Sequence, residues 1–80
     1  MAKFSFNINI TALKNAIINK RKESIEVMLP CLEYDIRRYY SLLENEELEE
    51  SSITRFNRVI KNIRKGLNEL GYSIDKLLKD

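Results

Sequence analysis

The clearest feature of the sequence is a repeat of apolar side chains at alternating intervals of three and four residues. It runs through eight positions: Ile53, Phe56, Ile60, Ile63, Leu67, Leu70, Ile74 and Leu77. Because this spacing places its members on one side of an α-helix, it predicts a long amphipathic helix. Gly71 interrupts the repeat and is a candidate C-cap, and Ser73 can cap a short last helix through Leu78.

A second repeat of the same kind lies upstream, at Ile25, Leu29, Leu32, Ile36, Tyr39 and Leu43. Pro30 falls inside it. Because proline has no N–H group and its ring clashes with the carbonyl of Glu26, we expect a break or a sharp kink near residues 28–30. Proline suits the first position of a helix, so we favour a helix from Pro30 to about Leu48. A continuous bent helix is the alternative.

Polar segments separate these repeats from each other and from the start of the chain. Five acidic residues fall within residues 44–50, and either Ser51 or Ser52 can cap the helix that follows. Upstream, Thr11 is a candidate N-cap for a first helix over residues 12–18. A polar run then leads into the second repeat, as either exposed helix or a short break.

The N-terminal residues 3–10 alternate between polar and apolar side chains, with the apolar ones at Phe4, Phe6, Ile8 and Ile10. This pattern is typical of a half-buried β-strand. No other segment alternates in this way, so we expect an extended arm that packs on the helices or pairs with the edge of a partner. A first helix that begins near Asn7 is the alternative.

Together these patterns predict an all-α protein. Two apolar repeats joined by a polar turn form a helical hairpin, and the first helical stretch can pack across it. We therefore predict an antiparallel helical hairpin or a small three-helix bundle with a short C-terminal helix. In this prediction residues 1–10 are an extended N-terminal arm and residues 11–80 are a single helical domain.

Composition narrows the chemistry of the chain. Its 80 residues include no histidine, no tryptophan and one cysteine, Cys31, which we expect to be a small buried apolar residue. A Ser-His-Asp triad, a Cys-His pair, a Cys/His zinc site and an internal disulfide are thereby excluded. We expect no catalytic residues, no metal, no cofactor and no small-molecule substrate. Because a chain this short has a marginal core, a protein partner or a second copy is expected.

The chain also carries features that bear on its location. Its start lacks the apolar run of a signal peptide, and no stretch approaches the roughly 20 apolar residues of a membrane span. A single cysteine suits a reducing interior. We therefore expect a cytoplasmic protein that does not insert into membranes.

A basic stripe marks the second half of the chain, at Arg55, Arg58, Lys61, Asn62 and Lys65. The simpler interpretation is a solvated helix face, since the pI of about 8.8 lies below the value of about 9 that is usual for nucleic-acid binders. The alternative is a surface for phosphates or an acidic partner. No motif that reads base sequence accompanies the stripe, so nucleic acid would be bound through its backbone. The acidic residues 44–50 lack the glycine and aspartate of a cation loop and are interpreted as a solvated turn.

Candidate anchors for a protein partner are Phe4, Phe6, Ile8 and Tyr40. Tyr40 is the more exposed of two neighbouring tyrosines in this interpretation, because Tyr39 belongs to the apolar repeat. Two ion pairs within the helix are also predicted, one at i, i+4 and one at i, i+3: Glu33–Arg37 and Asp35–Arg38.

The order of these features resembles the helical domain of archaeal GINS replication subunits. The resemblance rests on residues 28–30 (Met-Leu-Pro), Tyr34, residues 39–44 (Tyr-Tyr-Ser-Leu-Leu-Glu), the acidic turn and a long helix with arginines from Arg55 to Arg64. It covers roughly residues 13–70 and implies a scaffolding subunit of a replication complex. The chain departs from the family in lacking its small β domain.

Two functions are therefore expected from the sequence. The first is a small non-enzymatic helical accessory or adaptor protein that acts by binding another protein. The alternative is an accessory subunit that binds nucleic acid, or belongs to the replication machinery, through the basic stripe.

Overall fold

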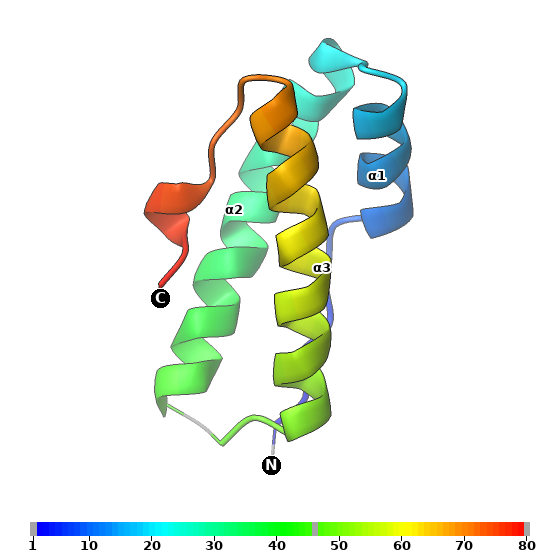
Figure 1. Cartoon of the computed structure of the whole chain (residues 1–80). Coiled ribbons are helices and arrows are strands. Elements are labelled where there is room, and N and C mark those ends of the chain that lie inside the picture. Colours follow the sequence, from blue (N-terminus) through cyan, green and yellow to red (C-terminus); the bar gives the residue numbers. More distant parts are fainter. Residues whose placement is uncertain (1, 46, 80) are drawn as a thin grey trace.

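The computed structural model describes residues 2–45 and 47–79. Its elements, in chain order, are α1 (Ile10–Ile18), α2 (Lys22–Asn45), α3 (Glu50–Glu69) and a short 3₁₀ helix, η1 (Asp75–Leu77). Helices α2 and α3 run antiparallel, and α1 lies against both of them at one end (Figure 1). The predicted all-α fold is confirmed as a small three-helix bundle.

The N-terminal arm completes this bundle. At 1.5 Å per residue, α1 is only about 14 Å long and α2 about 36 Å, so α1 covers less than half of the hairpin. The extended residues 2–9 run along the remaining part (Figure 1). Helix α1 begins at Ile10 because Asn9, and not the predicted Thr11, is its N-cap: the Asn9 side chain accepts a hydrogen bond from the backbone N–H of Ala12 at 3.0 Å.

An aromatic cluster joins the arm to the hairpin. The rings of Tyr39 and Phe56 are stacked with their centroids 3.5 Å apart, and the Phe4 ring meets both of them edge-on at 5.3 and 5.5 Å. Most members of the two apolar repeats are buried or half-buried, as predicted, although Leu43 near the end of α2 is 40% exposed.

Helix α2 passes through Pro30 without a break. The favoured prediction of a new helix that begins at Pro30 is wrong, and the continuity expected in the alternative, a continuous bent helix, is confirmed. Pro30 and Glu26 both lie on the exposed side of α2, where water can hydrogen-bond the carbonyl that proline leaves without a partner. Ile25 and Leu32, on either side of the proline, are fully buried in one core, so both halves of α2 are anchored to the same core.

The predicted end of α2 is also corrected. The helix stops at Asn45, and the buried Leu48 belongs to an extended connection that forms an isolated parallel bridge with Ala2. Neither predicted serine caps α3, whose N-cap is Glu49. Ser52 instead uses its hydroxyl to accept a hydrogen bond from the backbone N–H of Phe4 at 3.1 Å.

The end of α3 follows the prediction for Gly71. This glycine has a φ of +91°, and its N–H donates to the carbonyl of Asn68 while the N–H of Tyr72 donates to that of Leu67. These two bonds define a Schellman motif. Ser73 accepts a hydrogen bond from the N–H of Asp75 at 3.2 Å, but the last helix is a single 3₁₀ turn and does not reach Leu78.

A buried carboxylate fastens the arm to α2. Asp35 is fully buried, and its Oδ2 accepts hydrogen bonds from the backbone N–H groups of Asn7 and Ile8 at 3.0 and 2.9 Å. Its Oδ1 accepts a bond from Arg38 at 3.2 Å, and the Arg38 guanidinium lies 4.5 Å from the centre of the Phe4 ring. The predicted Asp35–Arg38 pair is confirmed and belongs to the link between arm and bundle.

Two further predictions concern exposed positions of α2. The pair of Glu33 and Arg37 is confirmed, with 2.8 Å between carboxylate and guanidinium. Cys31 was expected to be buried, but it is exposed. It lies on the outward side of α2, opposite the buried apolar repeat.

Candidate functional site

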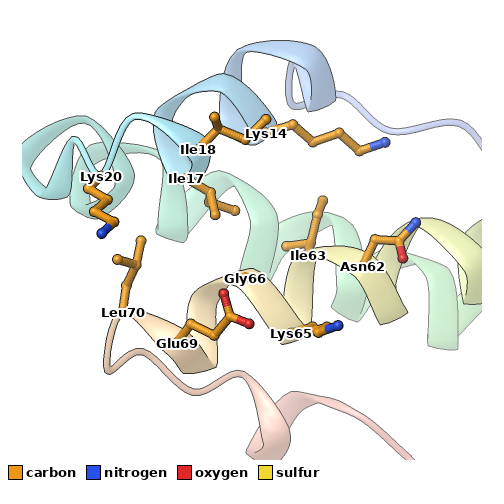
Figure 2. A pocket seen from close by; sticks show the side chains of 10 residues that line it. All are labelled: Lys14, Ile17, Ile18, Lys20, Asn62, Ile63, Lys65, Gly66, Glu69 and Leu70. Atoms are coloured by element: carbon orange, nitrogen blue, oxygen red, sulfur yellow. The ribbon is translucent and has the colours of Figure 1, made fainter.

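A cleft of about 690 Å³ opens between α1 and α3 (Figure 2). Both helices, the turn after α1 and the last residue before the Gly71 turn contribute to it. Its lining residues are Lys14, Ile17, Ile18, Lys20, Asn62, Ile63, Lys65, Gly66, Glu69 and Leu70.

The floor of the cleft is apolar. Ile63 is buried in the core, whereas Ile18 is 73% exposed at the cleft. Gly66 allows α1 to lie close to α3, because a Cβ atom at this position would meet Cγ2 of Ile17 at 2.7 Å. The close approach brings the side chain of Ile17 toward Leu70 and Ile63, whereas Ile18 lies farther from α3 (Figure 2).

The rim of the cleft is cationic. Lys14 and Lys20 belong to the α1 side and Lys65 and Glu69 to the α3 side (Figure 2). Within the described parts of the chain, none of the three lysines forms an ion pair. Three ammonium groups and one carboxylate therefore surround an apolar floor, which favours a negatively charged occupant with an apolar side.

Lys20 holds an unusual backbone conformation at this rim. Its φ is +55°, in the left-handed region that residues with a side chain seldom adopt. The N–H of Lys20 donates to the carbonyl of Ile17 and that of Arg21 to Ala16, so α1 ends in the same Schellman motif as α3. Here a lysine occupies the position that Gly71 occupies in α3.

The structure separates the residues of the predicted basic stripe. All five are exposed on α3, as the sequence predicts, but only Asn62 and Lys65 line the cleft. Lys61 lies on the other flank of α3, in a smaller cleft of about 190 Å³ that it shares with Tyr40. The remaining two members, Arg55 and Arg58, line neither of these clefts.

The predicted anchor residues contact this chain itself. Phe4 and Ile8 are buried in the core, and the half-buried Phe6 stacks on Phe56 with 5.6 Å between ring centroids. The half-buried Tyr40 uses its hydroxyl oxygen to accept a hydrogen bond from the backbone N–H of Lys79 at 2.9 Å. These side chains therefore already have intramolecular partners.

Sequence reasoning missed Lys14, Ile18 and Lys20 as site residues. One signal was available for Ile18: it follows Ile17 directly, and two adjacent positions of a helix are about 100° apart around its axis, so both do not face the core equally. No sequence pattern marks the two lysines, because their role depends on where α3 lies.

Two tyrosines outside the cleft have pKa values above the ordinary value for tyrosine. Burial, followed by the neighbouring Tyr40, raises the pKa of Tyr39. Burial, the hydrogen bond to Glu26 and the charge of that carboxylate raise the pKa of Tyr72. Neither group belongs to the cationic rim, whose charge is set by lysines and one glutamate.

Metal sites and membrane-spanning helices are absent from the described residues. Residues 2–45 and 47–79 contain no group of three His, Cys, Asp or Glu side chains placed to hold a metal ion. None of the helices in these ranges has the length and apolarity needed to cross a membrane.

No protein-family model, curated protein or solved structure matches this chain. Nothing in these comparisons bears on the resemblance to GINS subunits, which stays a prediction.

Proposed function

We propose that the chain is a small non-enzymatic accessory protein that binds a helical segment of an acidic partner protein in the α1/α3 cleft. An amphipathic helix with one apolar side and acidic flanks matches an apolar floor with a cationic rim. It would pack beside α1 and α3 as a fourth helix of the bundle. We place this protein in the cytoplasm because a single cysteine suits a reducing compartment.

The observation that carries the proposal is the exposure of Ile18 between lysines. A single exposed apolar side chain is ordinary on a protein surface. Ile18, however, is 73% exposed in a concave site whose other apolar members include Ile17 and Leu70. Burial of these side chains under a partner's apolar face would supply affinity, and the lysines would select for acidic flanks.

The backbone of Lys20 supports the same site. A left-handed lysine costs roughly 1 kcal/mol relative to a glycine at such a position. Unfavourable backbone conformations are concentrated at functional sites, where the side chain has a use that offsets the cost. A role for the Lys20 ammonium group at the rim of the cleft is such a use.

The proposal is tested with a labelled synthetic peptide that forms an amphipathic helix, with leucines on one side and glutamates on both flanks. Fluorescence anisotropy is expected to show binding of this peptide and none of a peptide with lysines in place of the glutamates. Ile18→Asp is expected to weaken binding at least about tenfold, because it places a charge at the apolar edge of the cleft that the partner would cover.

Val27→Asp is the matched control, because Val27 is a similarly exposed β-branched residue of α2 outside the cleft. It is expected to bind the acidic peptide as tightly as the unmodified chain does. Equal binding of both peptides, or no effect of Ile18→Asp, would contradict the proposed function.

A second candidate function is binding of nucleic acid, alone or within the replication machinery. It is favoured by the exposure of Arg55 and Arg58 on α3, neither of which forms an ion pair within the described residues. Labelled DNA or RNA would then bind with an affinity that falls steeply as salt rises. Arg58→Glu would weaken this binding while leaving the affinity for the acidic peptide nearly unchanged. If labelled DNA or RNA is not retarded in a native gel at low salt and micromolar protein, this candidate function is excluded.

A further inference from the structure

A second surface of the molecule is exposed and apolar, on the outward side of α2. Val27 is 79% exposed and Tyr34 is 59% exposed, and Pro30 and Cys31 between them are also exposed. Positions 27, 30, 31 and 34 are separated by three or four residues, so the four side chains lie on one side of the helix. We call these four residues the α2 stripe. Its exposure means that the described residues of the chain leave it uncovered.

The α2 stripe is symmetric about its own centre. Val27 and Tyr34 stand the same number of positions from the midpoint between Pro30 and Cys31. Beyond the large side chains, one end carries the exposed Glu23 and the other end the exposed Arg37. A helix with this order of residues is complementary to an antiparallel copy of itself.

We propose that two copies of this chain associate through the α2 stripe, with the two α2 helices antiparallel. Val27 of each copy then lies against Tyr34 of the other, and the two-fold axis passes between residues 30 and 31. This arrangement places Glu23 of each copy beside Arg37 of the other, whose guanidinium also holds Glu33 of its own helix at 2.8 Å, so the opposite charges meet twice. A parallel arrangement would bring Glu23 next to Glu23 and Arg37 next to Arg37, and like charges disfavour it.

The dimer leaves the α1/α3 cleft open. The cleft is lined by α1, α3 and the residues that follow them, and the α2 stripe belongs to neither helix. A contact through one helix from each copy is smaller than a standard interface of about 1,600 Å², so the association is weak and concentration-dependent. The dimer would present two clefts, which is a bivalent arrangement. The dimer does not depend on what the cleft binds.

Sedimentation equilibrium over a range of protein concentrations tests the proposal. The unmodified chain is expected to dimerise, and Val27→Asp to weaken dimerisation at least about tenfold by placing a carboxylate against Tyr34 of the other copy. Ile18→Asp, at a similarly exposed position outside the stripe, is the matched control and is expected to dimerise normally. A chain that stays monomeric at every concentration, or a dimer that survives Val27→Asp unchanged, would overturn the proposal.

Charge reversal tests the antiparallel order. Glu23→Arg is expected to weaken the dimer, because the new arginine lies beside Arg37 of the other copy. Adding Arg37→Glu to the same chain is expected to restore dimerisation relative to either single variant, because opposite charges face each other again. Arg37→Glu alone accounts for the loss of its pair with Glu33. No restoration in the double variant would reject the antiparallel arrangement.

Cys31 provides an independent measure of the same geometry, since two copies of it would flank the two-fold axis. With diamide as oxidant, the two thiols would form one S–S bond while two electrons and two protons pass to diamide. Non-reducing gels are expected to show rapid formation of the linked dimer, its loss in Cys31→Ser, and slow formation in Val27→Asp. Equal cross-linking rates in Val27→Asp and in the unmodified chain would contradict the proposed interface.

Discussion

The carboxylate of Asp35 accepts hydrogen bonds from three donor groups that water would otherwise solvate. It accepts hydrogen bonds from the N–H groups of Asn7 and Ile8 and from the guanidinium of Arg38, and its side chain is fully buried. A buried carboxylate is tolerated only where such partners compensate for its lost hydration. Asp35 therefore links the position of the arm directly to the position of α2.

Replacing this carboxylate is expected to destabilise the fold. Asp35→Asn keeps the shape but removes the charge and leaves fewer acceptor sites for the same donors, and we expect a loss of about 2–4 kcal/mol in the free energy of unfolding. Urea denaturation measures it. The control is Asp75→Asn, which affects the exposed pair with Arg64 and should cost less than about 1 kcal/mol. Equal losses in the two variants would contradict this role for Asp35.

Lys20 is expected to lower the stability of the fold while it strengthens binding of the acidic peptide. Lys20→Gly relieves the left-handed strain at the end of α1 and should raise the free energy of unfolding by up to about 1 kcal/mol, less the entropy that glycine adds to the unfolded chain. The same change removes one ammonium group from the cleft and should weaken binding of the acidic peptide. Thermal unfolding and anisotropy measure the two effects. A variant that is more stable and binds as before would remove Lys20 from the site.

For single residues, the sequence predicts ion pairs within a helix better than it predicts whether a side chain is buried or exposed. The spacing of Asp35 and Arg38 predicts their ion pair, because both lie on one helix. The burial of Asp35 depends on the arm, which is far away in the sequence. No pattern in the arm's residues indicates where it packs on the helices. Burial of Phe4 and Ile8 and exposure of Cys31 are likewise set by how whole segments pack, which local patterns do not specify.

At the scale of elements, the contact between α1 and α3 depends on one missing methyl group. Gly66→Ala adds a Cβ that would meet Cγ2 of Ile17 at 2.7 Å, and Ile17, being β-branched on a helix, has little freedom to move that atom. We expect this contact to outweigh the gain of about 1 kcal/mol in helix propensity, so that Gly66→Ala lowers stability.

A double-mutant cycle tests this prediction. In a chain that already carries Ile17→Ala, the atoms that would clash are gone, and Gly66→Ala should then stabilise the protein by up to about 1 kcal/mol. Chemical denaturation of the four chains measures the coupling. Gly66→Ala that is stabilising in both backgrounds would show that α1 does not lie so close to α3.

Helix positions follow from the sequence more reliably than helix boundaries do. The apolar repeat that begins at Ile53 predicts α3, and Gly71 predicts its end, because both signals are local. Pro30 predicts a break that does not occur, because the cost of one lost hydrogen bond is met on the exposed side of α2 while tertiary packing holds both flanks. The capping role expected of Thr11 fails because Asn9 caps α1. Those expected of Ser51 and Ser52 fail because α3 begins before them, and the Ser52 hydroxyl accepts a hydrogen bond from the arm.

At the scale of the whole molecule, the position of the cleft and the position of the arm both follow from the short length of α1. Helix α1 is shorter than the hairpin on which it packs, and the arm fills the part of the hairpin that α1 does not reach (Figure 1). The cleft opens where α1 meets the C-terminal half of α3. The sequence predicts the three helices and the arm separately, but this site follows from how the pieces are placed in space.

The arm is therefore expected to be part of the fold. A chain that begins with methionine followed by Asn9 keeps the cap of α1 but lacks residues 2–8, so that Tyr39, Phe56 and Asp35 lose their cover. Truncating one buried phenylalanine costs about 3–5 kcal/mol, and small domains have only about 5–15 kcal/mol of stability in total. We expect the shortened chain to lose cooperative unfolding, as measured by circular dichroism during heating.

Two point variants measure how much single side chains of the arm contribute to stability. They also separate this contribution from a general effect of shortening the chain. Phe4→Ala, at a position that is 6% exposed, should lower the free energy of unfolding by about 3–5 kcal/mol. Phe6→Ala, at a half-buried position, should cost less, because its ring already contacts water in the folded state. A shortened chain that unfolds cooperatively at an unchanged midpoint, or equal losses in the two variants, would mean that the bundle is stable without its arm.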